Sequence, residues 1–209
     1  MNESSKWTRE MQPGFAVVAQ VKMKNEQQIA AIRAQLEKPL VLIGMMGAGK
    51  TTQGRKLAEF LGIEFVDSDI EIEAEQKMQV SDIFAQFGES HFRELEKDKI
   101  SQLIDGGVKV ISVGGGAVTN SETMAAILSK TLCIWIDAPI AVLAKRTSGT
   151  GTRPLLNGGD AEEILGERMA QRRHLYEQAH IRANGVGAAD QVALNTLGQI
   201  YDYLLKEIE

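Results

Sequence analysis

The chain has 209 residues, of which 44 % are hydrophobic and 24 % charged, and its formal net charge is −5. This composition is typical of one globular domain, so it excludes a disordered, fibrous or collagen-like protein. An acidic chain lacks the basic footprint of general nucleic-acid binders, and no apolar stretch approaches the roughly 18 residues of a membrane span. We therefore expect a cytoplasmic protein that binds neither nucleic acid nor membranes. The single cysteine, Cys133, lies in an apolar run, which predicts a buried core thiol.

The N-terminal part of the chain shows a change of pattern at Asn25. Residues 1 to about 24 have no sustained periodicity, so we expect a mobile or loosely docked extension there. From Asn25 onwards, apolar residues repeat on one helical face, which predicts a helix over about 25–38 that ends before Pro39. These patterns divide the chain into an N-terminal extension, residues 1–38, and a main domain, residues 39–209.

After Pro39, short apolar runs alternate with helical patterns. Strands are expected at 40–43, 64–66, 108–113 and 132–136, with a weaker fifth strand near 180–184. Helices are expected at about 50–61, 69–78, 82–87, 89–104, 119–128, 160–178 and 190–207, and after Pro139. Capping boxes are expected at Thr119 with Glu122 and at Asp160 with Glu163. Apolar strands that alternate with helices predict a parallel sheet covered on both faces, and hence an α/β fold.

Residues 44–51, GMMGAGKT, match the phosphate-loop pattern G-x-x-x-x-G-K-[ST] without a mismatch. The pattern follows an apolar strand and opens a helix, as this loop requires. Glycines let successive backbone N–H groups point at an anion, and the helix N-terminus adds partial positive charge. Lys50 would reach the β- and γ-phosphates and the Thr51 hydroxyl would bind Mg²⁺. The sequence therefore predicts a nucleoside triphosphate site.

Asp67 and Asp69 follow the second predicted strand, with both carboxylates on one side of an extended backbone. One could support the metal ion while the other accepts a proton from a substrate hydroxyl. Two alternatives stay open at this point. Asp69 could merely cap the helix that follows. Asp137, at the end of the fourth strand, could be the metal carboxylate or a helix-entry residue.

Several ordered motifs together resemble shikimate kinase over about residues 39–205. They lie at 47–52, 65–69, 92–96, 114–118, 152–156 and 172–176. The resemblance implies a three-layer α/β/α P-loop kinase fold with a five-stranded parallel sheet. It also implies transfer of the ATP γ-phosphoryl group to the 3-hydroxyl of shikimate, with Mg²⁺ as cofactor. We expect a monomer whose partners are these small molecules.

The resemblance also implies residue roles. Asp69, Lys50 and Arg153 would be catalytic, with Asp69 as the candidate base and Arg153 on a lid near 148–160. Thr51 and Asp67 would hold Mg²⁺. The shikimate pocket would consist of Asp69, Arg93, Gly115 and Arg172. The ATP site would consist of Gly47, Ala48, Gly49, Lys50, Thr51, Thr52, Arg146 and Arg153, with Arg146 near the adenine.

Each substrate arginine also has a simpler interpretation from its neighbours. Arg93 could pair with Glu89 on its own helix, and Arg172 could lie on a charged surface. The segment 145–182 nevertheless holds seven basic and five acidic residues, so cations gather in the predicted lid and substrate helix. Two other functions remain possible: a different small-metabolite kinase such as a gluconate kinase, or a nucleotide-binding module without transfer activity.

Overall fold

A computed structural model describes residues 25–147 and 160–206 of the chain. Within these ranges five parallel strands form one sheet in the order β2-β3-β1-β4-β5. The strands are β1 (Leu40–Ile43), β2 (Phe65–Asp67), β3 (Val110–Ser112), β4 (Leu132–Asp137) and β5 (Ile181–Asn184). The predicted α/β class is confirmed, and all the predicted strands are present, with β3 shorter than predicted.

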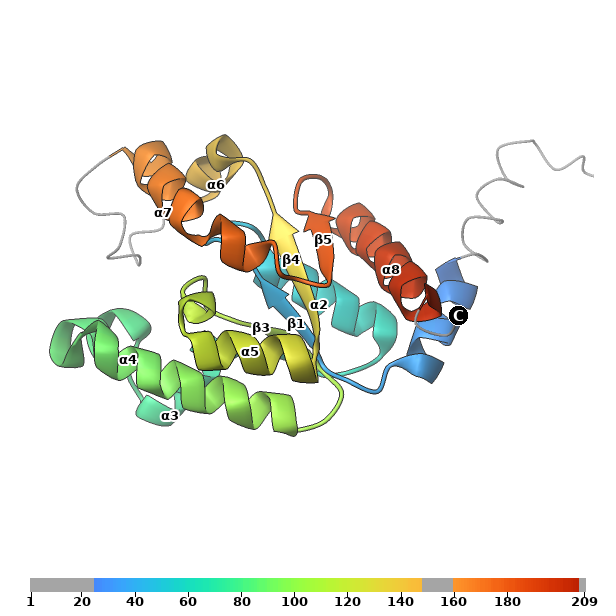
Figure 1. Cartoon of the computed structure of the whole chain (residues 1–209), viewed down its shortest axis with the longest axis horizontal. Helices are drawn as coiled ribbons and strands as arrows, with labels where there is room; N and C mark the ends of the chain where they lie inside the picture. Colours follow the sequence, from blue (N-terminus) through green and yellow to red (C-terminus); the bar gives the residue numbers. More distant parts are fainter. Residues whose placement is uncertain (1–24, 148–159, 207–209) are drawn as a thin grey trace, which may run out of the picture.

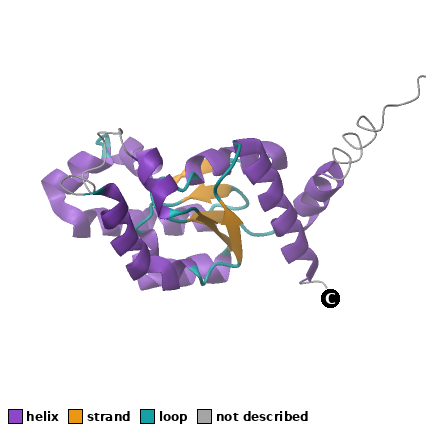
Figure 2. Cartoon of the chain, turned by 90° about the horizontal axis from the view of Figure 1, so that it is seen from above, coloured by secondary structure: helices purple, strands orange, loops and turns teal. Residues whose placement is uncertain are grey.

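Helices cover both faces of the sheet (Figures 1 and 2). They are α2 (Lys50–Leu61), α3 (Ser68–Gln76), α4 (Val80–Asp105), α5 (Ser121–Lys130), α6 (Ile140–Thr147), α7 (Ala161–Tyr176) and α8 (Ala189–Lys206). Helix α2 contacts β1 and β3, α8 contacts both α2 and β5, and α5 contacts β4. The strands of this sheet read as continuous apolar runs because helices bury them on both sides.

Helix α4 joins two segments that the sequence predicts as separate helices. The backbone at Gly88 has φ 83° and ψ 170°, so the helical dihedral angles are interrupted there. Glycine adopts positive φ without the steric penalty of a Cβ atom. The predicted break between 82–87 and 89–104 is therefore confirmed, although the two segments follow one another without a loop.

The predicted capping box at Thr119 is wrong. Residues Ala117–Thr119 form a 3₁₀ turn, in which both the backbone N–H and the hydroxyl of Thr119 donate to the Gly116 carbonyl at 3.0 and 2.7 Å. The Thr119 hydroxyl is thus used inside the turn. Asn120 caps α5 instead, because its side chain accepts a hydrogen bond from the Thr123 N–H at 3.0 Å. At α7 Asp160 is the N-cap as predicted, but its side chain accepts from the N–H of Glu162, at 2.9 Å, and not from that of Glu163 as a capping box requires.

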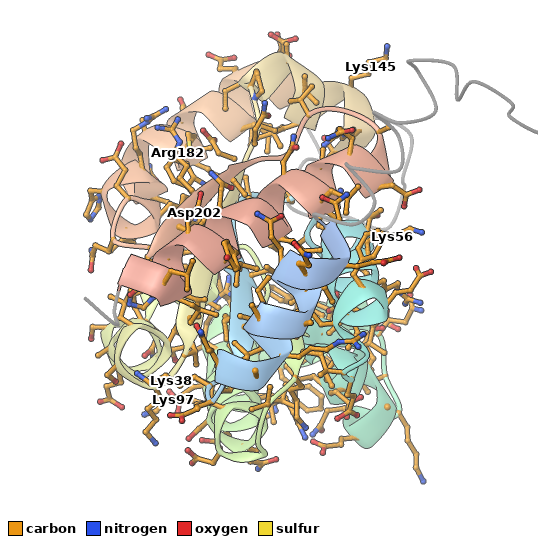
Figure 3. The ribbon with its side chains drawn as sticks, turned by 90° about the vertical axis from the view of Figure 1, so that its right-hand side faces the viewer. Lys38, Lys56, Lys97, Lys145, Arg182 and Asp202 are labelled. Atoms are coloured by element: carbon orange, nitrogen blue, oxygen red, sulfur yellow. The ribbon has the colours of Figure 1, made fainter. Side chains whose placement is uncertain are left out.

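Residues 25–35 form a helix that lies beside α2 and α8 (Figure 3). It ends a few residues before the predicted limit at 38. Ile32 is fully buried in the main core, and the Arg33 guanidinium donates to the Phe60 carbonyl at the end of α2 at 2.8 Å. The helix therefore packs as part of the folded domain, whereas residues 1–24 lie outside the described residues.

Replacing Ile32 by alanine is expected to lower the free energy of unfolding by about 2–4 kcal/mol, because it removes a fully buried side chain and leaves a cavity. Chemical denaturation measured by circular dichroism would show this as a lower midpoint. The exposed Gln27→Ala on the same helix is the control and should unfold like the parent protein. Equal midpoints for both variants would show that the helix does not stabilise the domain.

Cys133 is fully buried in β4, as predicted, and burial raises the pKa of its thiol to about 12. The thiol is therefore protonated at neutral pH and unsuited to nucleophilic chemistry. In the part of the chain that the structure describes, no helix combines the length and apolar character needed to cross a membrane. The predicted lid falls almost entirely on residues 148–159, which lie outside the described residues.

Candidate active site

The register of the sheet aligns the ends of β1, β2 and β3, so the loops that follow these three strands begin at the same edge of the sheet. Leu42 of β1 and Asp67 of β2 both pair with Ser112 of β3, so the three residues form one row across the sheet. Gly44, Asp69 and Gly114 each lie two residues beyond this row. The order in which strands are added to the sheet changes side at β1, which has β3 on one side and β4 on the other. Ligand crevices form at such switch points. A cavity of about 670 Å³ opens here.

The phosphate loop forms one wall of this cavity. Its glycines Gly44, Gly47 and Gly49 have φ values of 142°, 79° and 96°, which only glycine adopts easily. The Lys50 ammonium donates to the carbonyls of Gly44 and Met45 at 2.9 and 3.1 Å, so it lies against its own loop. Helix α2 begins at Lys50, and its N-terminus therefore points at the space where an anion would bind.

Thr51 and Asp67 meet at the base of the phosphate loop. The Thr51 hydroxyl donates to Oδ2 of Asp67 at 2.8 Å, while Oδ1 of Asp67 accepts from the Asp69 N–H at 3.2 Å. Asp67 is thus the cap of α3, and the alternative in which Asp69 caps the helix is wrong. A hydroxyl and a carboxylate side by side are the hard oxygen ligands that Mg²⁺ prefers when phosphates complete its shell. The residues present fit that ion.

Asp69 lines the same cavity as the phosphate loop. Burial raises the pKa of its carboxyl to about 7, and the nearby charges of Glu96 and Asp67 add to the effect, while Lys50 and Arg93 oppose it. Among the described residues, neither Oδ1 of Asp69 nor Oε1 of Glu96 has a hydrogen-bond partner, although both atoms are buried. Buried acceptors normally have a donor. The pair is therefore suited to accept hydrogen bonds from a hydroxylated ligand.

Arg93 forms the ion pair with Glu89 that the sequence suggested and also lines the cavity. Its guanidinium donates to Oε1 of Glu89 at 2.9 Å, the pair expected along one helix. It also donates to Oε2 of Glu96 at 2.6 Å and lies against the backbone of Gly116. Arg93 therefore lines the cavity and is fixed there by two carboxylates.

Arg172 and Gly115 are brought together across 57 residues of sequence. The Arg172 guanidinium donates to the Gly115 carbonyl at 3.1 Å, and the Tyr176 hydroxyl donates to the same oxygen at 2.8 Å. Tyr176 is fully buried and also contacts the Met45 sulfur at 3.5 Å. The glycine loop after β3 is thus tied both to α7 and to the phosphate loop. Arg172 lines the cavity rather than lying on an open charged surface.

Arg146 joins the phosphate loop to the loop after β5. Its guanidinium donates to the carbonyls of Gly47 and Ala48, both at 3.3 Å, and to the carbonyl of Gly185 at 3.0 Å. It lines the edge of the cavity together with Thr52. The other arginine predicted to contact phosphate, Arg153, lies outside the described residues.

Two residues of the site have no role in the sequence analysis. Glu96 follows Arg93 by three positions and Tyr176 follows Arg172 by four, so each lies on the same helix face as its arginine. That spacing is a signal that could have identified them. Asp137, considered above for the metal, does not approach Thr51. Its carboxylate accepts from Arg182 at 2.6 Å and lines a different cavity, so this alternative is wrong.

Comparison with known proteins agrees with this geometry. The family model for shikimate kinase matches residues 46–208. The chain belongs to the shikimate kinase family. The shikimate kinase of Paramagnetospirillum magneticum is 40 % identical over 178 residues, which cover 85 % of this chain and 90 % of that protein. The shikimate kinase of Rhodopseudomonas palustris is 38 % identical over 182 residues, with coverage of 87 % and 90 %.

A solved shikimate kinase also has this fold. The enzyme from Acinetobacter baumannii in complex with shikimate superposes with a TM-score of 0.77 at 32 % identity, over 86 % of this chain and 98 % of that chain. Shikimate kinases are ATP-dependent enzymes that transfer a phosphoryl group to an alcohol. The three-layer P-loop kinase fold implied by the sequence motifs is therefore confirmed.

Proposed function

We propose that this shikimate kinase transfers the γ-phosphoryl group of ATP to the 3-hydroxyl of shikimate at the cavity described above. One observation carries the residue-level proposal. The Asp69 carboxylate lines the same cavity as Lys50 and Thr51 of the phosphate loop and as Arg93 and Arg172, and the charges of both Lys50 and Arg93 act on it. A shikimate hydroxyl held at Asp69 would therefore be near the γ-phosphate of ATP in the phosphate loop. The rest of the shikimate molecule would be bound by Arg93 and Arg172.

At the nucleotide end, the loop N–H groups and Lys50 would hold the phosphates, and Arg146 would lie beside the adenine. Thr51 and Asp67 would hold Mg²⁺, which when bound with ATP neutralises charge on the β- and γ-phosphates. Phosphoryl transfer depends mainly on positioning and charge stabilisation, which these residues provide. We propose Arg153 as a further phosphate contact from the predicted lid.

At the acceptor end, Arg93 and Arg172 would bind the carboxylate of shikimate. A guanidinium is planar and presents paired donors that match a carboxylate, which a lysine does not. The hydroxyls would donate to the buried, unpartnered oxygens of Asp69 and Glu96. With a pKa of about 7, Asp69 is poised to accept the proton of the 3-hydroxyl as the phosphoryl group is transferred.

Measuring ADP release with and without shikimate tests this proposal. We expect release to depend on shikimate and the product to carry phosphate on the 3-oxygen, which phosphorus and proton NMR can establish. A nucleotide-binding module without transfer activity would show no acceptor dependence. Turnover of gluconate in place of shikimate would support the other kinase alternative, which the family assignment does not favour.

Gly114→Ala is expected to lower kcat/KM for shikimate by about a hundredfold, because small displacements of reacting groups are this costly. A Cβ atom at this position would collide with Oε1 of Glu96 and lie 3.0 Å from Oδ1 of Asp69. Gly198→Ala is the matched control, since its Cβ would meet nothing within 4 Å. If Gly114→Ala kept full activity, the two carboxylates would not form the acceptor site.

Arg172→Ala is expected to raise the KM for shikimate by about tenfold or more and to leave the KM for ATP nearly unchanged, because one charge-assisted contact to the substrate carboxylate is lost. Steady-state kinetics with each substrate varied in turn would measure both constants. Lys130→Gln, which removes an exposed ion pair with Asp105, is the control. An unchanged KM for shikimate would contradict the proposal that Arg172 binds the substrate carboxylate.

We also propose that the enzyme acts as a cytoplasmic monomer. The groups assigned to both substrates come from one chain, and the cysteine is a buried free thiol, as is usual in a reducing compartment. Light scattering coupled to size exclusion measures the mass directly. A dimer at assay concentrations would contradict the monomer.

A further inference from the structure

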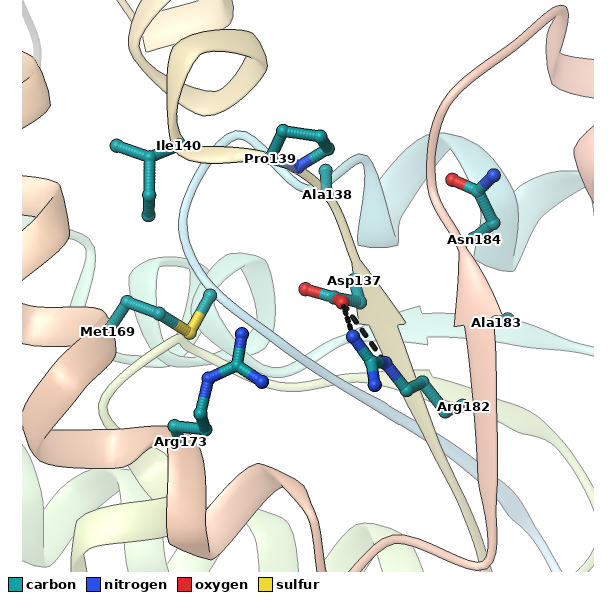
Figure 4. A pocket seen from close by; sticks show the side chains of 9 residues that line it. All are labelled: Asp137, Ala138, Pro139, Ile140, Met169, Arg173, Arg182, Ala183 and Asn184. Atoms are coloured by element: carbon teal, nitrogen blue, oxygen red, sulfur yellow. Dashed lines mark hydrogen bonds and ion pairs between the residues drawn. The ribbon is translucent and has the colours of Figure 1, made fainter.

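A second cavity lies between β4, β5 and the helices α6 and α7 (Figure 4). Its volume is about 410 Å³, and it shares no lining residue with the cavity at the phosphate loop. Ligand pockets for small molecules have volumes of about 300–1,000 Å³. The cavity is therefore large enough for a small metabolite and separate from the site of phosphoryl transfer.

Charged groups of both signs border this cavity. Arg182 donates through Nε and Nη2 to the same oxygen of Asp137, Oδ2, at 3.1 and 2.6 Å. The other oxygen of Asp137 points into the cavity, and so does the guanidinium of Arg173 from α7 (Figure 4). Within the described residues, Arg173 pairs with Glu177 through Nη1 at 3.2 Å, and a guanidinium has further N–H groups for a second partner. The cavity thus presents a cationic group and an anionic group to one space.

Apart from Asn184, whose side-chain oxygen accepts a hydrogen bond from the Val186 N–H at 3.0 Å, the rest of the wall is apolar. It consists of Ala138, Pro139, Ile140, Met169 and Ala183. Met169 and Ile140 lie on the side of the cavity away from Arg182 (Figure 4). Methionine adapts its shape to differently sized apolar partners. A ligand with charged groups at one end and an apolar group at the other would match a cavity that is charged on one side and apolar on the other.

We propose that this cavity is a binding site for an α-amino acid with an apolar side chain. The carboxylate would pair with Arg173, the ammonium group with the cavity-facing oxygen of Asp137, and the side chain would pack on Met169 and Ile140. A simple anion would pair with Arg173 but would bring a second negative charge against the cavity-facing oxygen of Asp137, because Arg182 contacts this carboxylate only through Oδ2. A zwitterion satisfies both groups, and for this reason we place an amino acid here and not inorganic phosphate or a plain carboxylic acid.

Trp135 gives the site a built-in reporter. Its buried ring lies under both arginines, with the guanidinium carbons of Arg182 and Arg173 at 4.7 and 5.9 Å from the ring centre. Tyr176 stacks on the same ring at 5.7 Å. Cations over an indole change its electrostatic surroundings, so movement of Arg173 towards a bound carboxylate will shift the emission of Trp135. The chain has one other tryptophan, Trp7, which the variant Trp7→Phe removes.

The test is a titration of Trp7→Phe with L-phenylalanine and L-leucine, excited at the red edge of the tryptophan band, with isothermal calorimetry in parallel. We expect a saturable emission shift and matching heat. Arg173→Gln should weaken the affinity about tenfold, and 3-phenylpropionate, which lacks the ammonium group, should also bind about tenfold more weakly. Arg172→Ala, at the phosphate-loop cavity, should leave amino-acid binding unchanged.

Three outcomes would overturn the proposal. The first is absence of saturable binding by both methods. The second is equal affinity for 3-phenylpropionate and L-phenylalanine, which would remove the role of Asp137. The third is binding that disappears in Arg172→Ala and persists in Arg173→Gln, because the ligand would then occupy the shikimate pocket. None of these results depends on whether the chain phosphorylates shikimate.

Discussion

Lys50→Ala is expected to lower kcat by at least about a hundredfold while the fold stays intact, because the variant loses a fixed positive charge at the transferring phosphates. The Lys50 ammonium lies against the Gly44 and Met45 carbonyls, at the centre of the phosphate loop. The side chain is partly exposed and contributes to no apolar core, so its loss should leave the circular dichroism spectrum unchanged. Coupled assays of ADP release with saturating shikimate would measure kcat.

Lys56→Ala is the matched control, since it removes a lysine from the same helix. Lys56 pairs with Glu59 and Asp190 at the surface of α2 and α8, away from the cavity. Its removal should leave kcat unchanged. Normal turnover in Lys50→Ala would contradict the proposal that the phosphate loop holds the γ-phosphoryl group of ATP during transfer.

Asp69→Asn is expected to lower kcat by about a hundredfold or more, because general base and hydroxyl-orienting groups contribute effects of this size. Asparagine keeps the shape of the side chain, so a large loss would point to the charge and not to packing. Asp105→Asn, at the exposed end of α4, is the control and should retain full activity. If Asp69→Asn kept most of its activity, the reacting hydroxyl would be held elsewhere.

The pH profile separates the chemical role of Asp69 from a structural one. A base is active in its ionised form, so kcat/KM of the parent enzyme should fall as the pH drops below about 7, the raised pKa of this carboxyl. In Asp69→Asn this acidic limb should disappear from the residual activity. A limb that persisted unchanged in the variant would assign the titration to another group.

The same raised pKa predicts how stability changes with pH. The folded protein holds the Asp69 proton more tightly than the unfolded chain, whose carboxyl has its ordinary pKa of 3.8. Asp69 therefore lowers stability progressively as the pH rises from about 4 to about 7, and the full cost is present above pH 7. Asp69→Asn should accordingly have a higher Tm than the parent at pH 8, and the two should melt alike near pH 4.

Much of the fold is predictable from residues that are neighbours in sequence. The apolar run 40–43, the glycines after it and the helix from Lys50 to Leu61 agree with the structure at every boundary. Short β-branched runs favour strands and 3.6-residue apolar repeats favour helices through their local periodicity alone. The errors fall where a local pattern competes with a turn, as at Thr119, whose hydroxyl bonds to Gly116 rather than capping α5.

By itself, then, the sequence determined the α/β class, the strands, the phosphate loop and, through its ordered motifs, the family. Only the tertiary structure decided which side chains meet. It brought Asp69, which follows β2, close to Gly114, which follows β3. It also joined Gly115 to Tyr176 and Asp137 to Arg182 by hydrogen bonds. Local pattern follows from adjacent residues, whereas these contacts depend on strand order and register, which join segments tens of residues apart.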